Sequence, residues 1–331
     1  MKIGLISCVH TTVLKHCVAD LAWGFSELGH EVEVLDENGE WCAANGMDIT
    51  PEEFSNFIDD FKPESLIQFD GLRGNHALLI PPEIPFVSWI MDRLPWLCNS
   101  EIASYCLPND RILFMFDEFR SEFIEKWRYP AAQCHTMHMG VNTRVYGLEE
   151  RPRDDRFDVD IAFVTRLNSQ MPRSRMDSRM AAARLAIETG KSVGLYGVGW
   201  DEHEEFKPYF RGVVEPGPEL CACYQQARLH VHANEDTNWH MRTLECISSG
   251  GRIACHEPGE TIRSYPYPYC HPFRNAKDLT RIFDAVEERN GTHSMTSFAQ
   301  HEWACQAHSY EVRAREIIEI AKPDSLADVP F

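Results

Sequence analysis

Short apolar runs recur along the chain, each followed by a longer stretch in which apolar residues return every three or four positions. The first run, residues 3–9 (IGLISCV), precedes an amphipathic stretch that ends at Gly29, and the alternating segment 31–36 (EVEVLD) follows. A continuous apolar run is typical of a strand buried on both faces, and glycine commonly stops a helix. Strand, helix, glycine and strand in this order predict a parallel α/β domain.

The same alternation continues through the first half and starts again after a charged segment, residues 148–158 (LEERPRDDRFD). A new apolar run at 159–164 opens the second series, which closes with long helical patterns at 276–289 and 297–320. A chain of 331 residues suits two domains of about 150 residues each. We therefore expect two α/β domains joined by a polar linker.

Charge and composition exclude some broad classes of protein. Acidic residues outnumber basic ones 51 to 32, for a formal net charge of −19, which repels phosphate backbones at long range but is compatible with a local basic groove. No run approaches the ~20 apolar residues of a membrane span, and the N-terminal run lacks the basic segment of a signal peptide. We expect a cytoplasmic protein in which the 12 cysteines are reduced.

Two sets of histidines and cysteines deserve comparison with metal sites. His230 and His232 alternate on a predicted strand and so share one face, and Cys255-His256 and Cys270-His271 form a second set. Neither set has the spacing of a zinc site. We interpret both as packed core residues and expect no metal ion.

The segment 235–251 (EDTNWHMRTLECISSGG) contains the most informative spacing in the chain. Arg242 and Glu245 stand three residues apart and share a face of the predicted helix, directly after a polar loop. Helix N-terminal amides and an arginine suit a diphosphate, and a carboxylate one turn later suits ribose hydroxyls. An exposed Arg–Glu pair on an ordinary amphipathic helix explains the spacing equally well.

The segment RTLECISSGG resembles the arginine-x-x-glutamate helix of GT-B glycosyltransferases. The resemblance is greatest to the spore-maturation-type group and to the T-even phage DNA β-glucosyltransferases. Further segments agree in order: FVTRL (163–167), LYGVGW (195–200), RGVV (211–214) and YQQA (224–227). The resemblance implies a GT-B fold, in which two Rossmann-like domains face each other across a cleft. It implies an N-terminal domain over 1–147, a donor-binding domain over 158–296 and a helix, 297–322, that returns to the N-terminal domain.

The resemblance also implies roles for individual residues. Arg242 contacts the donor diphosphate, Glu245 binds the ribose, and Gly197 in LYGVGW lies on the donor side. The families keep further phosphate-binding arginines after the first strand of this domain. The arginines in that part of the chain are Arg166, Arg173, Arg175 and Arg179. Their spacing around Pro172 allows several alignments, and at least two of them are equally well explained as solvated surface charge.

The segment VSWIMDRLPW (87–96) places Asp92 at the carboxyl end of a predicted strand, where α/β folds bind their ligands. An aspartate there can act as a general base toward an acceptor hydroxyl, or it can bond to backbone amides in the turn before Pro95. The segment resembles the stretch of the phage enzymes that carries the catalytic aspartate, with one residue fewer between the aspartate and the arginine. We expect inversion of the anomeric centre. His10, Thr11 and Thr12 are expected to border the acceptor.

The sequence contains no GxGxxG, no P-loop and no DxD pair placed as in metal-dependent transferases. We therefore expect a metal-independent glycosyltransferase with a nucleotide-diphosphate sugar as co-substrate and no other cofactor. A sugar-nucleotide epimerase and a non-catalytic nucleotide-sugar binder share this architecture. The acceptor is left open among saccharides, peptides, small molecules and hydroxymethylated pyrimidine in DNA.

Overall fold

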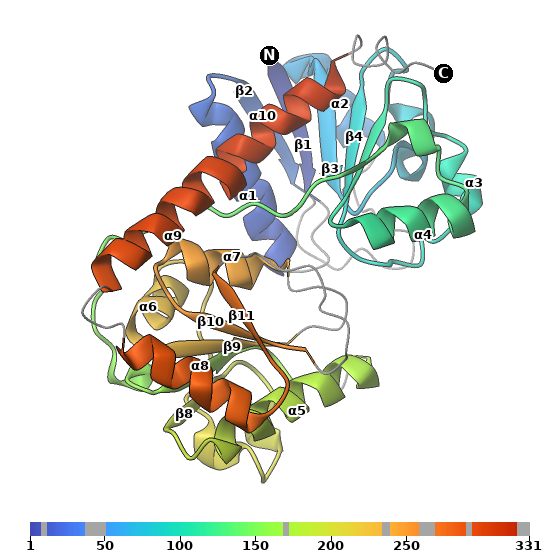
Figure 1. Ribbon diagram of the computed structural model, residues 1–331. Helices are drawn as coiled ribbons and strands as arrows, with labels where there is room; N and C mark the ends of the chain where they lie inside the picture. Colours follow the sequence, from blue (N-terminus) through green and yellow to red (C-terminus); the bar gives the residue numbers. More distant parts are fainter. Residues whose placement is uncertain are drawn as a thin grey trace. The chain divides into compact units, whose positions relative to one another are not determined.

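The computed structural model divides the chain into two compact units, each built around a parallel sheet with helices packed beside it (Figure 1). It describes residues 1–7, 12–36, 51–167, 172–233, 239–257, 269–288 and 293–322. The first unit comprises Met1–Met139 and Tyr310–Phe331, and the second comprises Gly140–Ser309. The α/β class predicted from the alternating apolar runs is confirmed.

The first unit holds a six-stranded sheet in its described part, in the order β2-β1-β3-β4-β5-β6, and neighbouring strands are parallel. The strands are β1 (Lys2–Ser7), β2 (Glu31–Asp36), β3 (Ser65–Phe69), β4 (Phe86–Ile90), β5 (Arg111–Phe114) and β6 (Cys134–Thr136). The helices are α1 (Thr12–Glu27), α2 (Pro51–Phe61), α3 (Ser100–Ala103), α4 (Asp117–Trp127) and α10 (Tyr310–Ala321), with short 3-10 segments at Arg73–Leu79 and Ala131–Gln133.

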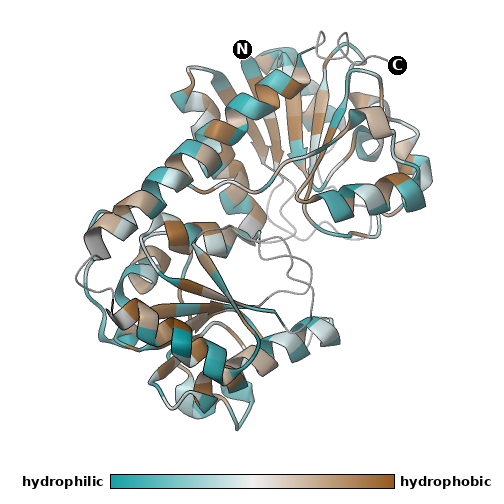
Figure 2. Cartoon of the chain, in the orientation of Figure 1, coloured by the Kyte–Doolittle hydropathy of each residue, from teal (hydrophilic) through white to brown (hydrophobic). Residues whose placement is uncertain are grey.

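The central strands of this sheet are buried on both faces. Every residue of β3, β4 and β5 is buried, and Figure 2 shows the strands of this sheet mostly in the colour of hydrophobic residues. A parallel sheet requires covering on both sides, because the connections between its strands pass over its faces. The continuous apolar runs in the sequence follow from this double burial.

Helix α10 is distant in sequence from the rest of the first unit but packs along α1 (Figure 1). Gly24 of α1 allows this approach, since a Cβ at Gly24 would lie 2.5 Å from the carbonyl oxygen of Tyr310. At the other end of α10, the buried Arg111 donates to the carbonyl oxygen of Ile320 at 2.9 Å. The small residue at 24 is therefore required by the helix that packs against it.

The second unit holds a five-stranded parallel sheet in its described part, in the order β11-β10-β9-β7-β8. The strands are β7 (Ile161–Val164), β8 (Val193–Tyr196), β9 (Leu229–His232), β10 (Ile253–His256) and β11 (Cys270–Phe273). The helices are α5 (Arg173–Glu188), α6 (Pro218–Gln226), α7 (Met241–Ser248), α8 (Ala276–Glu288) and α9 (His293–His308), with 3-10 segments at Asp155–Phe157, Trp200–Glu202 and Lys207–Tyr209. Among all described helices, none is both long and apolar enough to cross a membrane.

The predicted helix at 297–322 is two helices, α9 and α10, which belong to different units. The chain leaves the helical conformation at Ser309, which forms a parallel bridge with Val141. The amide of Val141 also donates to the carbonyl oxygen of His308 at 2.9 Å. Pairing with a segment far away in the sequence interrupts the helix, and helical periodicity alone does not indicate such a break.

The charged segment predicted as a linker lies within the second unit and is fastened to the end of α6 by two glutamines. Gln225 donates from Nε2 to the carbonyl oxygens of Gly147 and Glu149, at 2.9 Å each. Gln226 donates to the carbonyl oxygen of Pro152 at 2.8 Å. Each glutamine also accepts a backbone N–H through Oε1. The segment is thus an integral part of the second unit, in contrast to the predicted boundary at 147–158.

Substitution of Gly24 by alanine tests the packing of α10 on α1. Alanine is the better helix former by about 1 kcal/mol, so without the close contact Gly24→Ala would stabilise the protein. We expect instead a loss of about 1–3 kcal/mol in the free energy of unfolding, because the methyl group displaces the backbone at Tyr310. Chemical denaturation measures the change, and Ser26→Ala on the exposed face of α1 is the control. A more stable Gly24→Ala protein would contradict the packing.

Candidate functional site

The loops that follow β7 and β8 are joined at the carboxyl end of the second sheet. The amide of Leu167 donates to the carbonyl oxygen of Val198 at 2.7 Å, and Trp200 donates from its ring to that of Thr165 at 2.7 Å. Gly197, in the loop after β8, has a φ of +118°, and a Cβ at this position would lie 2.4 Å from the carbonyl oxygen of Thr165. Both the backbone conformation and the space demand glycine at 197.

Helix α7 follows β9 and carries the predicted donor residues Arg242 and Glu245. His240 is its N-cap, and its ring nitrogen Nδ1 accepts the backbone N–H of Arg242 at 3.3 Å. An N-cap usually uses a serine, threonine, aspartate or asparagine oxygen for this purpose. Since Nδ1 accepts, the neutral ring carries its proton on Nε2, so a hydrogen-bond donor is present at the positive end of the helix.

Three arginine side chains lie close enough to His240 for their charges to act on it: Arg242 from α7, and Arg179 and Arg175 from α5. The ring of His232, at the end of β9, is 5.0 Å from the ring of His240. We call these five residues the arginine–histidine cluster. Arg179 is 8% exposed and donates to the carbonyl oxygen of Arg166 at 2.7 Å. Guanidinium groups beside a helix N-terminus are suited to bind a multiply charged anion.

The two histidines of the cluster are held in the neutral state. Burial lowers the pKa of His240 well below its ordinary value, and the neighbouring His232 and the three arginines lower it further. Burial, with the charges of Arg242 and Arg179, lowers the pKa of His232 to about 3. At neutral pH the positive charge of the cluster therefore comes from its arginines, while the imidazoles supply hydrogen-bonding groups.

Glu245 is 4% exposed and accepts a hydrogen bond from the hydroxyl of Tyr224 at 3.3 Å. Burial, and next the charge of Glu245, raise the pKa of Tyr224 well above its ordinary value, so the hydroxyl keeps its proton. The predicted pair on α7 is thus asymmetric: Arg242 is half-buried, and the carboxylate one turn later is held in the interior by tyrosine. An exposed Arg–Glu surface pair does not describe this arrangement.

The other predicted donor arginines lie elsewhere on the second unit. Arg166 is exposed in the loop after β7. The side chain of Arg173 is 91% exposed and lies 3.9 Å from the carboxylate of Asp177 on the same helix. The charges of these two arginines are not among those that act on His240. Within the described residues the structure brings Arg175, Arg179 and Arg242 together and leaves Arg166 and Arg173 outside the cluster.

Asp92 is exposed and directly follows Met91 at the carboxyl end of β4, in the first unit. Its backbone N–H and that of Met91 both point to the carboxylate of Asp70, at the end of β3. On the predicted acceptor side, Thr12 is the first residue of α1, and His10 and Thr11 lie outside the described residues.

The histidines and cysteines weighed as metal ligands are mostly packed in the core. His230 is 2% exposed, its ring is 5.0 Å from that of Tyr224, and burial lowers its pKa to about 4. Cys255 and Cys270 are buried on adjacent strands. In the part of the chain that the structure describes, no three His, Cys, Asp or Glu side chains gather as a metal site would require. Metal independence itself stays a prediction.

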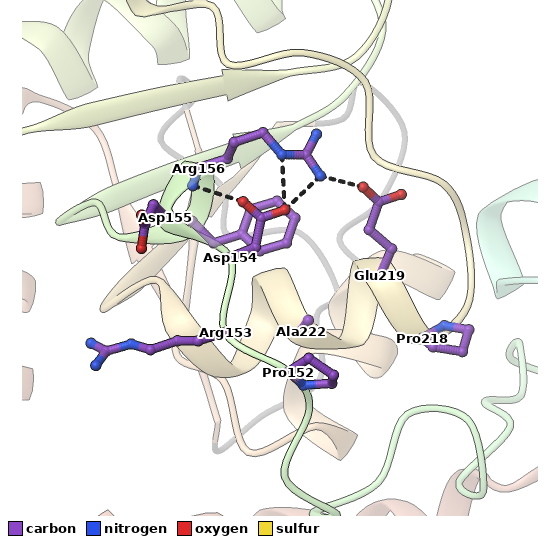
Figure 3. Close-up of a pocket in the computed structure, with 9 residues that line it drawn as sticks. Pro152, Arg153, Asp154, Asp155, Arg156, Pro218, Glu219 and Ala222 are labelled. Atoms are coloured by element: carbon purple, nitrogen blue, oxygen red, sulfur yellow. Dashed lines mark hydrogen bonds and ion pairs between the residues drawn. The ribbon is translucent and has the colours of Figure 1, made fainter.

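A cavity of about 600 Å³ lies elsewhere on the second unit, before β7 and at the start of α6 (Figure 3). Its lining residues are Pro152, Arg153, Asp154, Asp155, Arg156, Phe157, Pro218, Glu219 and Ala222. Figure 3 shows Arg156 directed toward Asp154 and Glu219, to which it is bound at 2.7 and 2.5 Å. This charge is satisfied by two carboxylates, and none of the predicted donor residues lines the cavity.

Sequence reasoning missed His240 and placed Arg179 only among four alternatives. Histidine is not a usual N-cap, and nothing in the residues before Arg242 indicates that the ring turns back onto the helix. The separation of Arg175 and Arg179 by one helical turn does indicate a common face. The sequence does not reveal that this face is directed toward α7.

Comparison with protein families identifies the segment that carries the cluster. A family model described as glycosyl transferase-like matches residues 173–319, from the start of α5 into α10. This part of the chain is therefore similar in sequence to glycosyltransferases. No curated protein matches the sequence at a significant level.

Solved structures of glycosyltransferases share the fold of the chain. A glycosyltransferase from Rickettsia africae is 11% identical, with 99% of each chain covered and a TM-score of 0.69. An α-glucosyltransferase in complex with UDP and a 13-mer DNA containing an HMU base is 12% identical, with 97% of this chain and 99% of that one covered and a TM-score of 0.63. The DNA-modifying β-glucosyltransferase, solved with and without uridine diphosphoglucose, is 14% identical over the same shares, with a TM-score of 0.58.

The buried histidines make stability depend on pH. The unfolded chain protonates His232 near pH 6.5, whereas the folded protein keeps it neutral down to about pH 3. The free energy of unfolding should therefore fall as the pH drops below 6.5, by about 1.4 kcal/mol per pH unit for each such group. We expect His232→Gln to remove the contribution of one histidine from this slope, measured by urea unfolding between about pH 7 and 5. His16→Gln, on the exposed face of α1, is the control, and an unchanged slope in His232→Gln would refute the assignment.

Proposed function

We propose that this chain, which has the GT-B fold, is a glycosyltransferase that transfers a sugar from a nucleotide-diphosphate donor, bound at the arginine–histidine cluster, to an acceptor hydroxyl. The observation that carries the proposal is that the charges of three arginines act on His240, the N-cap of α7, inside the segment that matches the glycosyl transferase-like family. Similar folds solved with UDP or uridine diphosphoglucose support a uridine donor.

The charges of the cluster suit a leaving diphosphate. When the bond between the anomeric carbon of the sugar and the diphosphate breaks, negative charge develops on the oxygen of the leaving phosphate. Fixed guanidinium groups, helix amides and the ring N–H of His240 stabilise that charge without rearranging. This work needs no divalent cation, and we expect transfer to survive EDTA.

Glu245 suits the ribose of the donor. Its carboxylate is shielded from water and already accepts one hydrogen bond, from Tyr224. A carboxylate has further lone pairs, and a ribose hydroxyl that reaches it gains a charge-assisted hydrogen bond. On α7, Arg242 thus recognises the diphosphate of the donor, and Glu245, three residues later, recognises its ribose.

Asp92 is our candidate for the general base on the acceptor hydroxyl. It lies at the carboxyl end of a buried strand and its side chain is exposed, so a substrate can reach it. A single displacement with this base inverts the anomeric centre. The similar structures include both an α- and a β-glucosyltransferase, so fold alone does not fix the anomer that forms.

DNA is the acceptor that similar structures suggest, and charge argues against it. Several of them are described with DNA or as DNA-modifying. The net charge of −19 on this chain opposes binding of a polyanion. We therefore favour a saccharide, peptide or small-molecule hydroxyl, and a transfer assay that includes duplexes with hydroxymethylated pyrimidine decides the question.

Substitutions on α7 test the donor site. Arg242→Ala should weaken binding of UDP by about 1.5–3 kcal/mol, the scale of a charge-assisted hydrogen bond. Glu245→Ala should weaken binding of UDP but not of inorganic diphosphate, because its proposed partner is the ribose. Isothermal titration calorimetry measures both. Arg184→Ala, on α5 but paired at the surface with Glu205, is the control. If Arg242→Ala and Glu245→Ala bind UDP like the wild type, the donor site lies elsewhere.

Asp92→Asn tests the base. The substitution keeps the shape and removes the basic carboxylate, so transfer should fall about 10²–10⁴-fold, while binding of UDP is unchanged. NMR of the product should show inversion. Asp59→Asn, at an exposed position of α2, is the control. Near-normal turnover of Asp92→Asn, or a retained anomer, would exclude Asp92 as the base. A protein that binds nucleotide-sugars and transfers to no acceptor would instead be a non-catalytic binder.

A further inference from the structure

We infer that Asp70 is a positioning residue, which fixes the backbone from which Asp92 projects by accepting the N–H groups of Met91 and Asp92. The inference rests on the proposed function, because it acts through the proposed base. Asp70 directly follows β3, and Asp92 lies two residues after β4, the neighbour of β3 in the sheet.

One carboxylate oxygen of Asp70 makes both contacts. Oδ1 lies 2.6 Å from the amide nitrogen of Met91 and 3.2 Å from that of Asp92. Beyond the last residue of β4 these amides no longer lie in the regular ladder of the sheet, so the side chain replaces the strand partner that they lack. A carboxylate binds two convergent N–H groups more strongly than a neutral acceptor does.

The backbone of Asp70 is itself held from several directions. Its amide donates to the carbonyl oxygen of Trp89 at 3.0 Å, and its own carbonyl oxygen accepts the ring N–H of Trp96 at 3.0 Å. The residue is 1% exposed and has a left-handed φ of +53°, a conformation that aspartate and asparagine tolerate better than other side chains. Asp70 thus connects the end of β3 to both ends of the segment 91–96.

The residue after Asp92 is anchored as well. Arg93 binds Glu122 of α4 at 2.8 Å, and its guanidinium lies 4.7 Å from the centre of the Phe119 ring. Asp92 therefore stands between one neighbour fixed by Asp70 and another fixed by α4, while its own side chain is exposed. Anchoring of both neighbours keeps the carboxylate of the base in one place, while its exposure leaves it accessible to the acceptor. Small displacements of a catalytic group strongly reduce the reaction rate.

Variants of Asp70 separate positioning from a general structural role. Asp70→Ala removes the acceptor, and we expect kcat to fall about 10–100-fold while the KM for the donor is unchanged. Asp70→Asn keeps an oxygen at the same place and tolerates the left-handed conformation, so it should recover most of the lost kcat. Asp110→Asn is the matched control, because Asp110 is equally buried in the first unit but binds Arg73. It should lower stability and leave kcat of the folded protein unchanged.

A double-mutant cycle then tests whether Asp70 acts through Asp92. In the Asp92→Asn background, Asp70→Ala should cause no further loss of transfer, because the group that it positions is already gone. Additive losses, or an Asp70→Asn variant as slow as Asp70→Ala, would overturn the inference. Near-normal turnover of Asp92→Asn alone would instead reject the proposed base. The failure of the inference and the failure of the proposed function are thus distinguishable.

Discussion

Parallel pairing of the strands is the constraint on which the rest of the structure depends. In a parallel sheet all carboxyl ends lie at one edge, so every loop that leaves a strand there joins a common rim. In the second unit this rim carries Gly197, after β8, and His232, at the end of β9. In the first unit it brings together Asp70 and Asp92. These residues are far apart in the sequence. They lie at a common rim because the strands of each sheet all run in one direction.

The periodicity of apolar residues was sufficient to predict the α/β class and most elements. Strands that are buried on both faces need continuous runs of apolar residues, and such runs are visible in the sequence. Helix α7 (Met241–Ser248), for example, lies in the segment 235–251, where the sequence predicted a helix. The break at Ser309 was not predictable in this way, since it depends on pairing with Val141. Helical propensity is a local property, and it gives way to tertiary contacts at such positions.

For the site, the spacing of Arg242 and Glu245 on one helix was visible in the sequence, whereas the partners of those residues were not. His240 and Asp70 act through contacts with backbone N–H groups, one along the chain and one across the sheet. A histidine before a helix and an aspartate after a strand have many ordinary explanations. Only burial and geometry distinguish those that organise a site from those that merely face water.

The first unit is built from two segments of the chain that are separated by the whole second unit, and this affects the order in which the protein can fold during synthesis. The second unit is one continuous segment, 140–309, whereas the first is completed by α10, which the ribosome makes after the whole of the second. The face of α1 around Gly24 therefore stays uncovered throughout synthesis of the intervening 170 residues (140 to 309 inclusive). Domains of nascent chains commonly fold in order from the N-terminus, but here the second unit can complete its own contacts first. Until α10 emerges, a chaperone that recognises apolar helix surfaces has a binding site on the unfinished first unit.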